Sequence, residues 1–186
     1  MNTNQKKALF IGLTTIDIQY FVEHYPLPNT KLKTDSPLIA VGGPAANAAI
    51  TFSVLGGKAD FLTCIGANTF TSIVNDDLAR YNVTVFDQLK DQATDPIVSS
   101  VITTLSNSDR TIITHHPQEL NHTVPVNKIT EQLDDYDLIF VDGFYPELSK
   151  SILPEAKKRQ IPVILDGGSW KTHLPELLKY IDIAIF

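Results

Sequence analysis

The chain has 186 residues, of which 43% are hydrophobic, and a formal net charge of −6 at pH 7. This apolar fraction lies above the disordered range and supports one sizeable core, while the acidic balance argues against nucleic acid as a main partner. The apolar stretch 8–13 is too short for a signal peptide, and no apolar run approaches the ~20 residues of a membrane span. Cys64 has no second cysteine to pair with. We therefore expect a globular cytoplasmic protein with no membrane partner.

Strand-like and helix-like segments alternate along the chain, which predicts a parallel sheet with helices packed on it. The expected strands are 8–13, 59–65, 137–141, 162–165 and 182–186. The expected helices are 44–55, 72–81, 127–133, 147–160, which contains a proline, and 174–180.

Three segments interrupt this alternation, namely 16–24, 31–41 and 97–114. They contain strand-like runs with no helix between them to form a parallel crossover. They predict a small antiparallel sheet inserted into the α/β core. Extra strands at the edge of the main sheet are the alternative interpretation.

The run GGPAAN at 42–47 joins an apolar strand to an alanine-rich helix. Gly42 and Gly43 lack Cβ atoms, so a ligand's polar groups can approach the main chain closely. Pro44 suits the first helical position, which places Asn47 in the first turn with its carboxamide leaning back over the glycines. An amide offers a donor and an acceptor together, which suits two neighbouring hydroxyls of a sugar. Tight packing of a helix on a sheet also favours glycine and alanine, and that alternative stays open.

This run, with the alanines that follow it, resembles the N-terminal signature of the ribokinase-like (PfkB) carbohydrate kinases. Upstream, FIGLTTID at 10–17 is similar to that family's first strand and its substrate aspartate. Downstream, DFLTCIG at 60–66 is similar to its second core strand and terminal glycine. The runs VDG at 141–143 and VILDGGSWK at 163–171 look most like the ketohexokinase and sulfofructose-kinase branch.

The resemblance extends from about residue 8 to residue 186 and implies a single partial ribokinase-like domain over 1–186. In that family the three inserted segments form a lid that covers the sugar and often builds a dimer interface. Asp17 and Gly43 lie where these segments join the core, which favours the lid interpretation. A closed lid would exclude water, which could otherwise accept the phosphoryl group.

Three aspartates, Asp17, Asp142 and Asp166, each follow an apolar strand. Ligands bind at the carboxyl ends of strands in an open parallel sheet, and a carboxylate there can hold two sugar hydroxyls. Asp17 matches the family motif directly, whereas the other two also suit helix caps and turns. Arg110 resembles a hairpin arginine of the ketohexokinase-like branch that reaches an anionic substituent or phosphate; a solvated hairpin charge is the alternative. The predicted substrate-binding residues are Asp17, Gly42, Gly43, Asn47, Arg110, Asp142 and Asp166.

Other motifs are rejected, and no metal site is predicted. The run GGSWKT at 167–172 has a tryptophan where a phosphate-binding P-loop needs glycine. The pair His115-His116 has no cysteine or nearby carboxylate to complete a metal set and is interpreted as part of a loop.

The family's catalytic Gly-Ala-Gly-Asp motif and its Asn-x-x-Glu element for magnesium and phosphate do not occur in these residues. The resemblance implies ATP and Mg as cofactors of a full-length parent whose catalytic base lies beyond Phe186. We therefore expect an N-terminal portion that is inactive alone. No catalytic residue is assigned within it.

The leading hypothesis is the sugar-binding portion of an ATP-dependent kinase that moves the γ-phosphoryl group to a hydroxyl of a ketose-like sugar. A non-enzymatic sugar-binding or dimerisation module is the alternative. A dinucleotide-binding protein is disfavoured because no Gly-x-Gly-x-x-Gly turn follows 8–13. The expected partners are a small sugar and a second copy of the chain, bound through the lid or through the last strand, where 183–186 carry neither charge nor proline.

Overall fold

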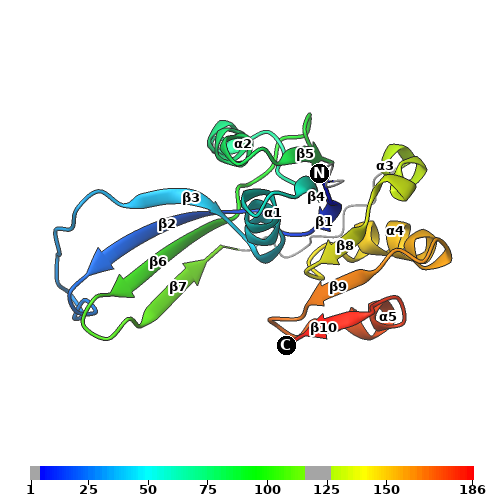
Figure 1. Ribbon diagram of the computed structural model, residues 1–186. Helices are drawn as coiled ribbons and strands as arrows, with labels where there is room; N and C mark the ends of the chain where they lie inside the picture. The colour runs from blue at the N-terminus through cyan, green and yellow to red at the C-terminus, as the bar shows by residue number, and fades with distance from the viewer. Residues whose placement is uncertain (1–4, 116–126) are drawn as a thin grey trace.

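The computed structural model describes residues 5–115 and 127–186. Its larger sheet has six parallel strands in the order β10-β9-β8-β1-β4-β5 (Figure 1). The strands are β1 (Lys7–Ile11), β4 (Lys58–Thr63), β5 (Thr84–Asp87), β8 (Leu138–Val141), β9 (Val163–Asp166) and β10 (Ile183–Ile185). The helices are α1 (Pro44–Val54), α2 (Thr71–Arg80), α3 (Asn127–Glu131), α4 (Pro146–Lys158) and α5 (Leu174–Leu178).

Helices cover both faces of this sheet, and alternation along β1 shows how the two layers form. Leu9 and Ile11 pack into a cluster with α4 and α5. Ala8 and Phe10 point to the other face and pack with α1 and α2. Because side chains alternate between faces along a strand, β1 buries apolar groups on both sides, as expected for a central parallel strand.

The chain reverses its winding direction between β1 and β8. From β1 it builds outward through β4 to β5, and it then returns to place β8, β9 and β10 on the opposite side of β1. In open α/β sheets, ligands bind at the carboxyl ends of the strands at such a reversal. The residues that follow β1 and β8 are therefore the candidates for a ligand site.

A second sheet of four strands projects from the core (Figure 1), and we call this sheet the lid. Its order is β3-β2-β6-β7, with β2 (Thr15–Val22), β3 (Leu38–Gly42), β6 (Val98–Thr104) and β7 (Arg110–Thr114). The two outer pairings are antiparallel as predicted, but the central β2–β6 pairing is parallel. The reason is that both strands leave the core at the same place, where Ile16 pairs with Val98, and run outward side by side.

The predicted α/β class with an inserted sheet is confirmed, with local differences in some elements; among them, the helix expected over 174–180 ends at Leu178. The short strand β5 was not predicted, because its four residues carry too little pattern to separate them from a loop. The helix expected over 127–133 is an α-helix only to Glu131, followed by a 3₁₀ turn, Leu133–Asp135. Within the expected segment 31–41, strand structure begins only at Leu38.

Candidate functional site

The carboxyl end of β1 meets the carboxyl end of β8 through Gly12 and Asp142. A Cβ on Gly12 would lie 2.2 Å from the carboxyl carbon of Asp142, so only glycine admits the carboxylate there. The Asp142 carboxylate accepts hydrogen bonds from the main-chain N–H groups of Leu13 (2.8 Å), Ala45 (3.2 Å) and Phe144 (3.0 Å). One buried carboxylate thus joins β8, the start of the lid and the N-terminus of α1.

Burial raises the pKa of Asp142 from 3.8 to about 6, although the three main-chain N–H groups and the nearby Lys171 charge act in the opposite direction. The side chain is 1% exposed. These contacts support the main chain around the site. The predicted role of Asp142 as a direct substrate ligand stays a prediction.

Asp17 and Gly42 lie against each other at the foot of the lid. A Cβ on Gly42 would lie 2.3 Å from Oδ2 of Asp17, so the glycine leaves room for this half-buried carboxylate. The hydroxyl of Thr15 donates to Oδ1 of Asp17 at 2.8 Å. Gly43 has φ +103°, and its Cβ would lie 2.3 Å from the Leu13 carbonyl oxygen. The glycine pair therefore packs directly on the junction between β1 and the lid.

Helix α1 begins at this junction with Pro44, as its fixed φ favours. The main-chain N–H of Asn47 donates to the carbonyl of Gly43 at 3.0 Å, so Asn47 lies in the first turn, as predicted. Its side chain is exposed. Asn47 is thus accessible to a ligand, and its binding role stays a prediction.

Asp166 ends β9 one strand away from Asp142, and its carboxylate accepts the N–H of Gly168 at 2.9 Å. The charges of both aspartates act on Lys171. Its Nζ lies 4.1 Å from the centre of the Phe144 ring and donates to the carbonyl of Ser169 at 3.0 Å. Burial lowers the pKa of this half-buried lysine. In the sequence, Lys171 belongs to the run 163–171 and is rejected as a P-loop lysine, and it is not among the predicted site residues.

Arg110 is not brought beside Asp17. In the lid, Asp17 is level with Ser99 on β6, and Ser99 is level with Thr114 on β7. Arg110 lies four residues further along β7, or about 13 Å at the usual strand rise, towards the outer end of the lid. It is exposed, and its role towards an anionic group stays a prediction.

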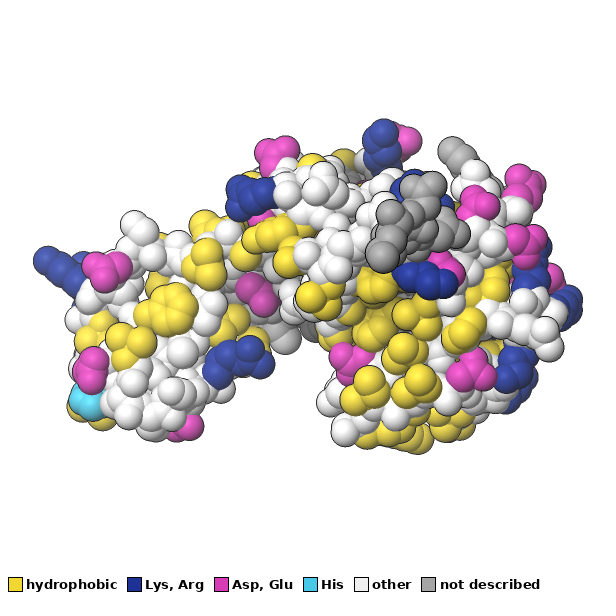
Figure 2. Space-filling model, in the orientation of Figure 1, with side chains coloured by type: hydrophobic (Ala, Val, Ile, Leu, Met, Phe, Trp, Pro, Cys, Tyr) yellow, Lys and Arg dark blue, Asp and Glu magenta, His cyan; other side chains and the backbone are white. Residues whose placement is uncertain are grey.

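A wide notch separates the lid from the lower part of the core in Figure 2. A recess of about 260 Å³ lies at the base of the lid. It is lined by Thr14 and Thr15 at the β1–β2 junction, by Cys64 after β4 and by Tyr145 after β8, among others. Lid, glycine junction and recess therefore share the carboxyl edge of the central strands.

The structure offers no metal centre within residues 5–115 and 127–186, where no group of three or more His, Cys, Asp or Glu is placed to hold an ion. His116, one half of the histidine pair, lies outside the described residues. Over the same ranges, no helix is long and apolar enough to cross a membrane.

A six-stranded parallel α/β sheet with an inserted four-stranded sheet and a glycine junction beside its winding reversal defines the class of fold. The sequence pattern of the pfkB family carbohydrate kinases matches residues 5–186. The chain belongs to this family.

The chain is also similar in sequence or in structure to individual known proteins. The nucleoside kinase of Methanocaldococcus jannaschii is 35% identical over 66 residues, which are 36% of this chain and 22% of that protein. The ribokinase of Giardia lamblia has a TM-score of 0.77 at 15% identity, over 97% of this chain and 57% of that one. The ribokinase of Arabidopsis thaliana, solved with ribose and ATP, has a TM-score of 0.74 at 19% identity, over 97% and 59%. The structural likenesses show the shared fold, and the chain spans less than two thirds of each of these proteins.

Proposed function

We propose that these residues form the sugar-binding part of an ATP-dependent carbohydrate kinase, which transfers the γ-phosphoryl group of ATP to a hydroxyl of a ketose-like sugar. The observation that supports this most is the close approach of Asp17 to Gly42, the first glycine of the pair, at the foot of the lid. This junction adjoins the reversal point of the sheet, where open α/β sheets bind ligands. The runs at 141–143 and 163–171 support the ketohexokinase and sulfofructose-kinase branch as the proposed subgroup.

In this proposal the sugar lies between the lid and α1. Thr15 engages one oxygen of the Asp17 carboxylate, and the other accepts from a sugar hydroxyl. From the first turn of α1, Asn47 offers its carboxamide to two other hydroxyls of the sugar. Asp142 supports this arrangement by holding the N–H groups of Leu13 and Ala45, one on each side of the glycine junction. Substrate contacts by Asp142, Asp166 and Arg110 are part of the same proposal.

ATP and Mg belong to the proposal only for a kinase that contains these residues together with a nucleotide site. In residues 5–115 and 127–186 no group of three or more His, Cys, Asp or Glu is placed to hold a metal ion. The Gly-Ala-Gly-Asp and Asn-x-x-Glu elements are also not found in the sequence. No catalytic step is assigned to the described residues.

The test is a calorimetric titration of the chain with a panel of ketoses and pentoses. Asn47→Ala should weaken sugar binding by about 1–3 kcal/mol, because a hydroxyl pair loses its partners. Asn75→Ala, a matched change at an exposed asparagine of α2, should leave the affinity unchanged. Equal affinities in the wild type and Asn47→Ala would remove Asn47 from the site, and a failure of every sugar to bind would contradict the proposal.

A further inference from the structure

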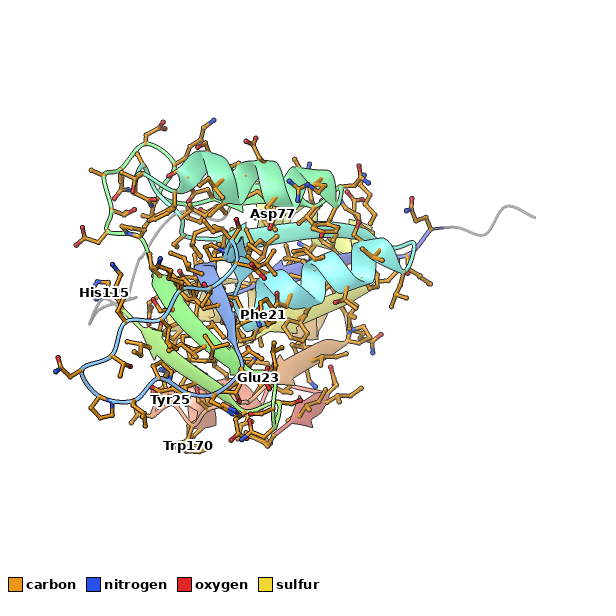
Figure 3. All side chains as sticks on the ribbon, turned by 90° about the vertical axis from the view of Figure 1, so that its left-hand side faces the viewer. Phe21, Glu23, Tyr25, Asp77, His115 and Trp170 are labelled. Atoms are coloured by element: carbon orange, nitrogen blue, oxygen red, sulfur yellow. The ribbon has the colours of Figure 1, made fainter. Side chains whose placement is uncertain are left out.

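Val41, the residue before the glycine pair, is held by a group from outside the lid. Its strand, β3, is an outer strand of the lid, so among the described residues one side of its main chain has no neighbouring strand. The N–H of Val41 donates to Oδ2 of Asp77, on α2, at 2.9 Å. Asp77 lies on the side of α2 that faces the core (Figure 3), and both residues of this bond are buried. A carboxylate on a helix thus binds the inner end of β3.

The helix itself does not explain an aspartate at this position. Asp77 lies in the last turn of α2, where the negative end of the helix dipole disfavours an acidic side chain. Aspartate is also a weak helix former. Burial of its carboxylate adds a cost that hydrogen bonds must offset. The contact with Val41, outside the helix, supplies such a hydrogen bond.

The ion pair with Arg80 is a weaker constraint on Asp77. Nη1 of Arg80 lies 3.2 Å from Oδ1 of Asp77, but the Arg80 side chain is 70% exposed. An ion pair with so exposed a partner contributes little to stability. A main-chain N–H that is buried and unpaired is costly, so the bond to Val41 is the stronger constraint.

The glycine pair needs such constraints from its neighbours. Glycine populates many backbone conformations, and Gly43 adopts φ +103°. On one side of the pair, Asp77 holds the N–H of Val41, and on the other side Asp142 holds the N–H of Ala45 at 3.2 Å. The permissive segment therefore lies between two main-chain N–H groups, each bound by a carboxylate from a different element.

A displacement of β3 would reach the Asp17 carboxylate. Ala40 of β3 is level with Asp17 of β2. A Cβ on Gly42 would lie 2.3 Å from Oδ2 of Asp17, so β3 and this carboxylate are in close contact. Val41 directly precedes Gly42 in the chain. The bond between Val41 and Asp77 therefore bears on the carboxylate that is proposed to hold the sugar.

We propose that Asp77 is a positioning residue of the sugar site. It holds the inner end of β3 through the N–H of Val41, and so keeps the glycine pair and Asp17 in the geometry that binds sugar. Asp77 acts through the main chain and is not itself a sugar ligand. This inference rests on the proposed function, because it takes the sugar position from that proposal.

The experiment titrates the full chain with fructose and ribose by calorimetry and follows the exchange of the Val41 amide proton by NMR. Asp77→Ala should weaken binding about tenfold, because the apparent affinity falls with the fraction of molecules whose junction has the binding geometry. The Val41 amide should also exchange faster. Asp77→Asn keeps an oxygen that can accept this N–H, so it should restore most of the affinity and the slow exchange.

Two neighbours on α2 provide matched controls. Asp76 is adjacent to Asp77 and exposed, so Asp76→Ala makes the same change of charge and helix propensity away from Val41. Arg80→Ala removes the ion pair and leaves the Val41 contact in place. Both controls should leave the affinity and the Val41 exchange unchanged. If Asp77→Ala does not fold, Asp77→Glu takes its place; it keeps the charge, displaces the carboxylate by one methylene and should also weaken binding.

The outcomes separate this inference from the function on which it rests. If Asp77→Ala lowers the free energy of unfolding but binds sugar as well as the wild type, Asp77 has a structural role alone; the inference is overturned and the proposed function stands. An equal loss of affinity in Asp76→Ala would also overturn the inference, since charge or helix propensity would be the cause. So would a loss that Asp77→Asn does not restore. A wild type that binds neither sugar would overturn both the inference and the proposed function.

Discussion

The carboxyl group of Asp142 is buried, and the free-energy cost of its ionisation makes the stability of the fold depend on pH. Its pKa in the folded chain is about 6, above the ordinary 3.8, so the folded state binds a proton more readily than the unfolded state between these values. The contribution of Asp142 to the free energy of unfolding should therefore fall as the pH rises from about 4 to about 6, and should be constant above that range.

Urea unfolding of the wild type and Asp142→Asn at several pH values measures this contribution. The stability of the wild type relative to the variant should decline between about pH 4 and pH 6, since the variant has no group to ionise at this position. The carboxyl carbon of Asp142 should titrate in NMR with a midpoint near 6. A midpoint at or below 4 would contradict the prediction, because the main-chain N–H groups would then outweigh burial.

Some residues of the site could be predicted because their evidence is local in sequence. Gly42, Gly43 and Asn47 form one short run, and the structure places all three at the junction of β3 with α1. The contacts of Asp142 could not be predicted, because they join it to Leu13 and Ala45 over separations of 129 and 97 residues. No pattern in a single sequence reports hydrogen bonds across such distances.

At the scale of elements, Gly12 and Gly42 each lie against a carboxylate, and substitutions at the two positions should have different effects. A methyl group on Gly12 would meet the fully buried Asp142, whereas one on Gly42 would meet the half-buried Asp17 at 2.3 Å. Gly12→Ala should therefore lower the free energy of unfolding by about 1–3 kcal/mol, as overpacking in a dense core does.

Gly42→Ala should cost less stability, because Asp17 has room to move, but it should weaken sugar binding by displacing that carboxylate. Chemical denaturation and calorimetric titration of both variants measure the two effects. If Gly42→Ala binds sugar as well as the wild type, Asp17 is not a sugar ligand in its observed position.

The pairing of the lid strands could be predicted only in part. Its strand-like runs were visible because no helix separates them, and the antiparallel neighbours β2–β3 and β6–β7 follow from chain proximity. The parallel β2–β6 pairing was missed, because it depends on two chain crossings at the same point of the core. The winding reversal between β1 and β8 escaped prediction for the same reason, since strand order is not encoded in local periodicity.

At the scale of the whole molecule, two exposed apolar surfaces favour self-association. The lid exposes Ile39 (46%) and Ile113 (64%) on one face and Phe21 (45%) on the other, and Figure 3 labels Phe21 and Tyr25 at the lid end of the molecule. The strand β10 forms one edge of the large sheet and exposes Ile183 and Ile185. Unpaired edges and exposed apolar patches recruit other chains.

Sedimentation across the micromolar range should therefore show a dimer or larger species. Ile113→Asp and Ile185→Asp, both at exposed strand positions, identify which surface is used, with Ile73→Asp on α2 as the control. The variant on the true interface should shift the species to monomer, and the other two should not. A wild type that sediments as a monomer throughout this range contradicts the prediction.

The 186-residue chain by itself should not phosphorylate sugars at a measurable rate. Phosphoryl transfer requires a held nucleotide, neutralised charge and a base beside the attacking hydroxyl. The junction of Asp17, Gly43 and Asn47 supplies candidates for holding the sugar alone. Loss of a positioned base typically removes about 10²–10⁴-fold of rate, and loss of anion-stabilising donors about 10²–10³-fold more. A coupled assay should therefore find no sugar-dependent ADP release from the purified chain. A sugar-dependent signal that disappears in Asp17→Asn would show that catalytic groups are present among these residues and that the proposed division of roles is wrong.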